Sequence, residues 1–362
     1  MKKKIIPIIA GTMAIAVSLS GCSCSSSSPL AFNNNFNGGQ KPSTTYKETL
    51  TYNVEYIDSY GTSFSKSESI PDNLLDIEIN GTYQMTLEVI DKNDTQIKNL
   101  ESQSNIVVQS DDKIGTHIYK LSTNLELETV YSSGIDGNSN DQDDGNSLKA
   151  KEQIITTAYF LSSGYSFNPI YSKTQGINTS YVTITSDATV QIAYTDYVTE
   201  VKYNVDDYTV ISKYGEPDKE TGKTPIDIKD EYSYSYRTLI DNNMLLFALR
   251  NVDIEEETSI QLPTVHPTYG EAQNLAITYV GNREQSIKID DMTEAENIKV
   301  KEYSMIRNVQ NATGSQQFIV IQKEKSENVE NKALLIQYVT PLNLYNSYLC
   351  IGGLKYSLVS TL

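Results

Sequence analysis

Apolar and polar side chains alternate with a period of two in many short stretches of this chain, and this pattern constrains its fold most. Residues 50–56 read Leu-Thr-Tyr-Asn-Val-Glu-Tyr, and residues 83–89 read Tyr-Gln-Met-Thr-Leu-Glu-Val. Such alternation places apolar side chains on one face of a β-strand and polar side chains on the other. Similar stretches predict further strands at 106–109, 117–121, 125–131, 153–161, 181–185, 189–194, 200–203, 208–213, 233–236, 258–262, 275–280, 286–289, 298–303, 318–322, 333–338 and 354–359.

Short strands separated by polar turns favour a mainly β fold of antiparallel strands. Gly61 predicts a turn, and Asn80-Gly81 is a dipeptide typical of a tight hairpin. One short helix is expected near residues 241–250, where Asp241 is a suitable N-cap. The apolar face of this helix would consist of Met244, Leu245, Phe247, Ala248 and Leu249.

The N-terminus has the three parts of a secretory signal. Lys2–Lys4 form a positive region, and residues 5–19 are largely apolar. This apolar stretch is shorter than the about 20 residues that a membrane-spanning helix needs. The small residues Ser20 and Gly21 then precede Cys22.

The run Leu19-Ser20-Gly21-Cys22 resembles the lipobox of bacterial lipoproteins. The resemblance implies that a diacylglyceryl lipid with palmitate-type chains is attached to Cys22, and that cleavage makes Cys22 the first residue. Two acyl chains anchor a protein stably where one is marginal. We therefore expect the protein on the extracytoplasmic face of the cell membrane, with the membrane as its partner through the lipid on Cys22. The alternatives are an ordinary signal peptide and an uncleaved anchor.

The other two cysteines have less specific interpretations. Cys24 is a bystander, a second acylation site or a reactive thiol. Cys350 lies in the apolar run 348–351, where a lone cysteine is usually a small buried hydrophobic residue. A disulfide between the two is the alternative, but the chain has no disulfide framework.

Composition changes along the chain indicate three regions. Residues 1–21 are the predicted signal peptide, and residues 22–45 form a Ser- and Asn-rich lipid-anchored tether that cannot bury a core. Residues 46–362 form the β-rich extracytoplasmic domain. The polar stretch 213–230 either divides this domain into two similar halves or lies within one continuous sheet.

The net charge excludes one class of ligand. The chain has 29 Lys and Arg against 46 Asp and Glu, a net charge of -17, and loss of Lys2–Lys4 with the signal peptide makes it more negative still. Such a chain repels nucleic acid, so no nucleic-acid partner is expected.

An acidic loop at residues 136–145 suggests calcium, because Ca²⁺ prefers oxygen ligands at alternate positions. Counted from Asp136, however, Asp141 stands where an EF-hand has Gly, and Ser147 stands where it has Glu. A start at Asn140 places Lys151 at the position of that Glu. A solvated hairpin tip is the better interpretation, and no metal ligand is predicted.

No catalytic motif is found in the sequence. His117 and His266 are the two histidines and lie far apart. Consecutive acids at Asp206-Asp207 and 255–257 would point to opposite faces of a strand, so they are interpreted as solvated turns. Neither a catalytic residue nor a cofactor is therefore predicted, and a hydrolase with carboxylates scattered in sequence is the remaining enzyme hypothesis.

Tyrosine is abundant, with 26 residues, and Trp is absent. Tyr232, Tyr234 and Tyr236 alternate with serines, which would place three phenols on one strand face. These rings could stack on a sugar, but cross-strand aromatic packing is the favoured interpretation.

Residues 150–362 resemble the β-clam group of bacterial envelope proteins, which includes lipoprotein carriers of the LolA type. The resemblance lies in a strand series, the helix-like run 241–250, and returning strands through Val280-Gly281-Asn282. It implies antiparallel, strongly curved sheet(s), a β-clam or half-barrel, wrapped around one short helix. It also implies an apolar concavity for acyl chains, without identifying a ligand-binding residue.

These observations lead to two main hypotheses. The first is a membrane-anchored surface lipoprotein whose non-catalytic β domain binds an apolar or amphiphilic ligand, such as a lipid, or supports envelope assembly. The second is a surface adhesion or glycan-binding module. Nothing in the sequence identifies a protein partner.

Overall fold

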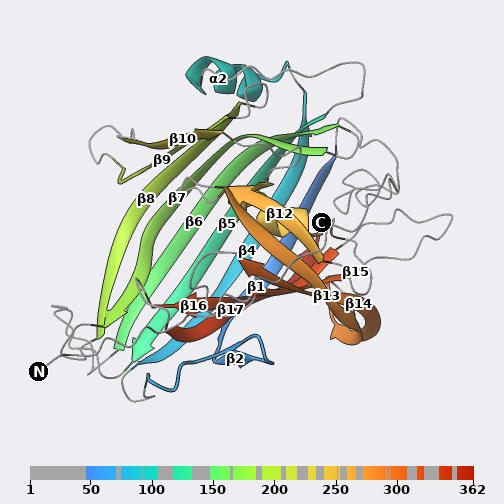
Figure 1. Cartoon of the computed structure of the whole chain (residues 1–362). Helices are drawn as coiled ribbons and strands as arrows, with labels where there is room; N and C mark the ends of the chain where they lie inside the picture. The colour runs from blue at the N-terminus through green and yellow to red at the C-terminus, as the bar shows by residue number, and fades with distance from the viewer. Residues whose placement is uncertain are drawn as a thin grey trace, which may run out of the picture.

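The computed structural model is organised around a single sheet of 15 strands (Figure 1). The strands follow the order β10-β9-β8-β7-β6-β5-β4-β1-β17-β16-β15-β14-β13-β12-β11. The structure describes residues 46–70, 75–91, 93–104, 117–132, 147–163, 166–184, 190–204, 209–217, 227–233, 240–250, 252, 259–265, 272–290, 292, 294–307, 316–321, 334–344 and 349–362.

Each half of the chain contributes one meander to this sheet. The first meander consists of β1 (Lys47–Ile57), β4 (Asp76–Ile90), β5 (His117–Ser132), β6 (Ser147–Ser163), β7 (Ser166–Ile184), β8 (Val190–Asn204), β9 (Thr209–Gly215) and β10 (Asp227–Ser233). The second consists of β12 (Ser259–Val265), β13 (Ala272–Ile287), β14 (Glu296–Arg307), β15 (Gln316–Ile321), β16 (Leu334–Asn343) and β17 (Cys350–Thr361). The short strand β11 (Ile240–Asp241) adds to this meander by pairing in parallel with β12. The polar stretch 213–230 includes the end of β9 and the start of the edge strand β10, and residues 218–226 between them lie outside the described residues.

The first and last strands join the two meanders. Strands β1 and β17 are antiparallel, with Val54 opposite Tyr356, and the backbone of Thr49 exchanges hydrogen bonds of 2.7 and 2.8 Å with Leu362. The alternation predicted for residues 50–56 is confirmed in β1, because Leu50, Tyr52 and Val54 are buried.

The main core lies on the concave side of the curved sheet, where the second meander passes over the long strands of the first (Figure 1). The 3₁₀ turn η1 (Asn242–Met244) and helix α3 (Leu245–Leu249) supply several of its side chains. Phe247 packs on Phe160 with a centroid distance of 5.7 Å, and Phe160 stacks on Tyr119 at 5.1 Å. The expected mainly β, antiparallel, curved fold with a short helix near 241–250 is thus confirmed.

A second helix, α2 (Thr95–Ser104), is absent from the sequence prediction. Asp94 caps it by accepting a 2.7 Å hydrogen bond from the amide of Gln96. Ile97 and Leu100 are too few apolar side chains to make a helical period evident. They are buried in a small cluster on the convex side of the sheet, together with Ile90, Ile118, Tyr159, Ile170 and Tyr171.

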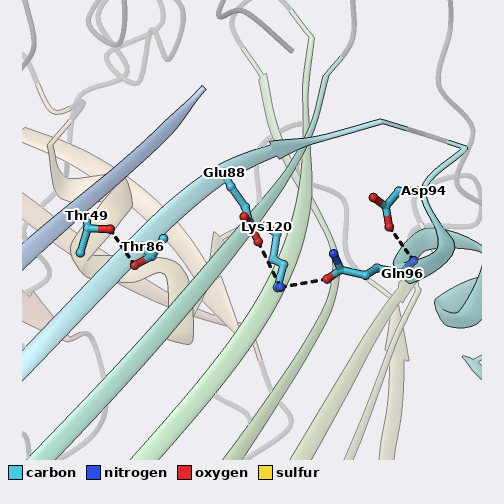
Figure 2. A network of polar contacts seen from close by, with 6 residues as sticks. All are labelled: Thr49, Thr86, Glu88, Asp94, Gln96 and Lys120. Atoms are coloured by element: carbon cyan, nitrogen blue, oxygen red, sulfur yellow. Dashed lines mark hydrogen bonds and ion pairs between the residues drawn. The ribbon is translucent and has the colours of Figure 1, made fainter. Parts of the chain in front are cut away.

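Polar contacts also hold α2 against the convex face of the sheet. Lys120 on β5 bonds Gln96 of α2 at 2.9 Å and forms a 3.1 Å ion pair with Glu88 on β4 (Figure 2). Nearby, the hydroxyls of Thr49 and Thr86 are hydrogen-bonded across β1 and β4 at 3.0 Å. The outward residues of these strands therefore pair with each other, and the inward residues form the core.

Several strand boundaries differ from those predicted. The segments 117–121 and 125–131 are one strand, β5. The predicted strands 189–194 and 200–203 are also one strand, β8, which begins at Val190. The hairpin prediction for Asn80-Gly81 is wrong, because these residues lie inside β4, paired with β1 and β5. The predicted strand at 106–109 lies outside the described residues.

A short hairpin packs on the convex face of β16 and β17. Its strands are β2 (Ser59–Tyr60) and β3 (Phe64–Ser65), and the predicted turn is present at Gly61 with a φ of 51°. Phe64 contacts Val339 and Cys350 there. Cys350 is buried with a free thiol, which agrees with the interpretation of this residue as a small hydrophobic side chain.

Candidate functional site on the concave face

On the concave face, β5 and β6 place apolar and polar side chains opposite each other. Leu127 lies opposite Glu152, and Leu125 lies opposite Ile154. The same face continues from Tyr83 on β4, which belongs to the main core. Glu152 is therefore a carboxylate at a position where the strand period requires an inward side chain.

Three donors hold the Glu152 carboxylate. Its Oε1 accepts hydrogen bonds from the Thr129 hydroxyl at 2.9 Å and the Ser180 hydroxyl at 2.7 Å, and its Oε2 accepts from the Ser180 amide at 2.9 Å. The Tyr131 hydroxyl lies 2.6 Å from the Ser180 hydroxyl. Glu152 is only 8% exposed. These hydrogen bonds hold both oxygens of the Glu152 carboxylate in place.

Tyr131, Tyr194 and Tyr197 lie close enough to Glu152 for its charge to act on their hydroxyls. Burial, reinforced by the Glu152 charge, raises the pKa of Tyr194 to about 12. Burial also raises the pKa of Tyr197 to about 12, with smaller contributions from Tyr214 and Glu152. These phenols therefore stay neutral at physiological pH and can offer hydrogen bonds and ring faces, but not proton transfer.

A bulge in β7 shapes this part of the face. The register of β7 and β8 shifts between Gly176 and Thr179, and Asn178 adopts a φ of 51°. The Asn178 amide donates a 2.8 Å hydrogen bond to Asp196. A Cβ on Gly176 would lie 2.2 Å from Cε1 of Tyr197, so the absent side chain makes room for this ring. The bulge thus accommodates Tyr197 and allows Ser180 to bond Glu152.

Hydroxyl groups continue along the concave face toward the other end of the strands. Thr156 and Thr174 are hydrogen-bonded at 2.9 Å, and both are buried. Thr199 lies opposite Thr174 and is buried as well. Val182 and Leu127 of the main core lie on the same face. The lining is therefore amphiphilic rather than purely aliphatic.

A second buried carboxylate, Asp241, connects the far edge of the sheet to β7 and β8. It accepts hydrogen bonds from the Ser172 hydroxyl, from the Tyr203 hydroxyl at 2.6 Å and from the Asn243 amide at 2.8 Å. Burial raises its pKa, and these donors oppose the rise. Asp241 is fully buried, so it holds β11 and η1 in place and has no access to a ligand from solvent.

An ion pair between β1 and the end of α3 is also internal. Arg250 bonds both carboxylate oxygens of Glu48, at 2.7 and 3.2 Å, and lies over the Phe247 ring at 5.4 Å. Both partners are almost completely buried. Because each charge has its counterpart, this pair positions α3 and is not part of the candidate site.

The residues singled out in the sequence are only partly described. Cys22, Cys24, the acidic loop 136–145, His266, Asp206-Asp207 and residues 255–257 lie outside the described residues. His117 is the first residue of β5. Tyr232 belongs to β10, but Tyr234 and Tyr236 lie outside the described residues, so the tyrosine ladder stays a prediction.

Glu152 and its tyrosines were not identified as a site from the sequence. The available signal was a charged residue at the inward position of a strand that is otherwise apolar on that face. The described part of the chain contains no cluster of His, Cys, Asp and Glu that could hold a metal ion. Within the same residues, no helix combines the length and apolar character needed to cross a membrane.

Comparison with known proteins yields little. No family model and no curated protein matches the chain. Among solved structures, the chain is similar to a protein from Brucella abortus described as a β-barrel-like protein of domain of unknown function DUF1849. The identity is 8% and the TM-score 0.42, over 88% of this chain and 98% of the other. A likeness at this level does not transfer a family or a function.

Proposed function

We propose that this protein is a surface lipoprotein, anchored through a lipid on Cys22, whose β domain binds an amphiphilic ligand on the concave face of β5–β8. The lipobox-like run ending at Cys22 supports the anchor. The amphiphilic lining supports the ligand, because it places a carboxylate and hydroxyls beside apolar side chains on one inward surface.

The observation on which the ligand proposal depends is the position of Glu152. A fully aliphatic concavity would suit an acyl chain alone, whereas a buried polar group beside apolar ones orients a ligand that has both characters. The exposed ring of Tyr194, at 38%, marks where solvent reaches this face. The ligand is therefore expected to carry a polar head and an apolar portion.

Native mass spectrometry would test the ligand proposal. Residues 46–362 include every strand described here and would be purified without detergent. A co-purified mass of lipid size that is lost on replacement of Tyr194 by Asp supports the proposal. No bound mass, even after incubation with alkyl amphiphiles carrying cationic, anionic and neutral heads, would contradict it.

The anchor has a separate test. The substitution Cys22→Ala removes the only thiol at the lipobox position, so we expect the protein to leave the membrane fraction and appear in the soluble fraction. Fractionation of cells followed by immunoblotting measures this, with Cys24→Ala as the matched control that should stay with the membrane. A Cys22→Ala protein that remains membrane-bound would show that lipid on Cys22 is not the anchor.

Glycan binding is the second candidate. Its specific support is the exposed Tyr194 ring beside hydrogen-bonding groups on the concave face, since aromatic faces and hydroxyl partners suit sugars. Binding to immobilised glycans that is lost in Tyr194→Ala, without binding of amphiphiles, would favour this function over the first.

A further inference from the structure

The charge on Glu152 has no cationic counterpart among the described residues. All three of its hydrogen-bond donors, the hydroxyls of Thr129 and Ser180 and the Ser180 amide, are neutral. None of the ion pairs formed by described residues includes Glu152. The other buried carboxylate with an ionic role, Glu48, has Arg250 as its partner.

A buried carboxylate without a cation is unfavourable, because neutral donors replace only part of the hydration that it loses. Three tyrosines lie beside this group. The Tyr131 hydroxyl lies 2.6 Å from the Ser180 hydroxyl, Tyr194 lies opposite Ser180 on β8, and Tyr197 lies opposite Gly176. The face of an aromatic ring is electrostatically negative. Carboxylate and rings together form an environment that favours a bound cation.

We propose that this environment binds the alkylated ammonium head of the amphiphilic ligand. This inference rests on the proposed function and specifies its ligand class. Glu152 already accepts three hydrogen bonds of the roughly four that a carboxylate can accept. A primary ammonium would need further acceptors, whereas a quaternary ammonium needs only charge and aromatic surface.

The remaining surface of the site suits the rest of such a ligand. Val182 is buried in the main core close to Ser180, and Ile192, opposite Val182, is partly exposed. An alkyl portion attached to the head can contact the exposed part of Ile192, whereas Val182 belongs to the core. The net charge of -17 also raises the local concentration of cationic ligands at the surface.

Saturation-transfer NMR with tetramethylammonium as the probe tests this inference, without detergent, on residues 46–362, which contain every described strand. We expect a transfer signal for tetramethylammonium, and a much weaker one for methylammonium and for tert-butanol, a neutral molecule of similar size. Equal signals for tetramethylammonium and tert-butanol, or a stronger signal for methylammonium, would overturn the assignment.

Two variants locate the site. Glu152→Gln removes the charge with little change in shape, and Tyr194→Ala removes the exposed ring; each should weaken tetramethylammonium binding by about tenfold. Tyr181→Ala is the matched control, because Tyr181 is 37% exposed, almost the same as Tyr194, and should leave binding unchanged. Circular dichroism confirms that each variant is folded, and Tyr194→Ala keeps the test valid if Glu152→Gln does not fold. Undiminished binding in a folded Tyr194→Ala variant would also overturn the inference.

Failure of the ammonium site can be distinguished from failure of the proposed amphiphile-binding function. Binding of amphiphiles with anionic or neutral heads, without preference for tetramethylammonium, would contradict the ammonium site while the amphiphile-binding function stands. Absence of binding by amphiphiles of every head group would contradict both.

Discussion

At the scale of single residues, the same dipeptide can form a turn or lie inside a strand. Asn80-Gly81 suggests a hairpin, yet Gly81 lies within β4, between β1 and β5. A Cβ on Gly81 would lie 2.1 Å from the carbonyl oxygen of Glu126. Close approach of the neighbouring backbone, and not a turn, therefore explains the glycine.

This explanation predicts that Gly81→Ala destabilises the domain by about 1–3 kcal/mol, because the backbone of β5 must move to admit the methyl group. Guanidinium denaturation, read from the midpoint at constant slope, measures the change. Gly281→Ala is the matched control, since Gly281 also lies in a strand but has nothing within 4 Å of the added Cβ. Equal stability of the two variants would show that β5 does not approach Gly81 so closely.

At the scale of elements, one side chain both begins a helix and fastens it to the sheet. Asp241 caps η1 through the Asn243 amide and accepts hydrogen bonds from Ser172 on β7 and Tyr203 on β8. The sequence supports the first role, because a cap is a local property. The second role depends on which strands the fold brings to the cap, and no local pattern contains this information.

The buried position of Asp241 predicts a pH dependence with a definite sign. Its folded-state pKa is raised, chiefly by burial, so its contribution to stability is fully present below the unfolded-state pKa of about 3.9. This contribution is lost as the pH rises from about 4 through the raised folded-state pKa. Asparagine does not titrate, so the stability advantage of the wild type over Asp241→Asn should decrease as the pH rises from about 4 to 7.

Urea denaturation of both proteins across this pH range measures the difference. Asp290→Asn is a useful control, because Asp290 is exposed and hydrogen bonds from Thr361 of β17 lower the pKa of its carboxyl group. Its contribution should change with pH in the opposite direction. An advantage over Asp241→Asn that grows with pH would show that the hydrogen-bond donors outweigh burial at Asp241.

At the scale of the whole molecule, the pairing of β1 with β17 makes one sheet from two meanders. The strands adjacent in this pair come from opposite ends of the domain, so the sheet is complete only when the last strand is in place. The ion pair between Glu48 and Arg250 is another contact between distant parts of the chain, and it holds α3 against β1. Long-range contacts of this kind, and not local propensity, determine the concave surface on which the candidate site lies.

The sequence by itself determined the antiparallel β class, most strand positions, the short helix with its Asp241 cap and the buried character of Cys350. These are consequences of period-two and capping patterns, which act between residues close in the chain. Local patterns missed α2, whose two apolar side chains gain their burial only against Ile90, Ile118 and Tyr159 of the folded sheet. The lipid on Cys22 stays a prediction from a local motif.

Only the tertiary structure decided which inward residues meet. Glu152 belongs to β6, Thr129 and Tyr131 to β5, Ser180 to β7 and Tyr194 to β8, so the site exists only in the register of four strands. A single-residue change of register would turn every one of these side chains to the other face. The physical reason is that side-chain direction is set locally by the strand, whereas neighbours are set by pairing between distant segments.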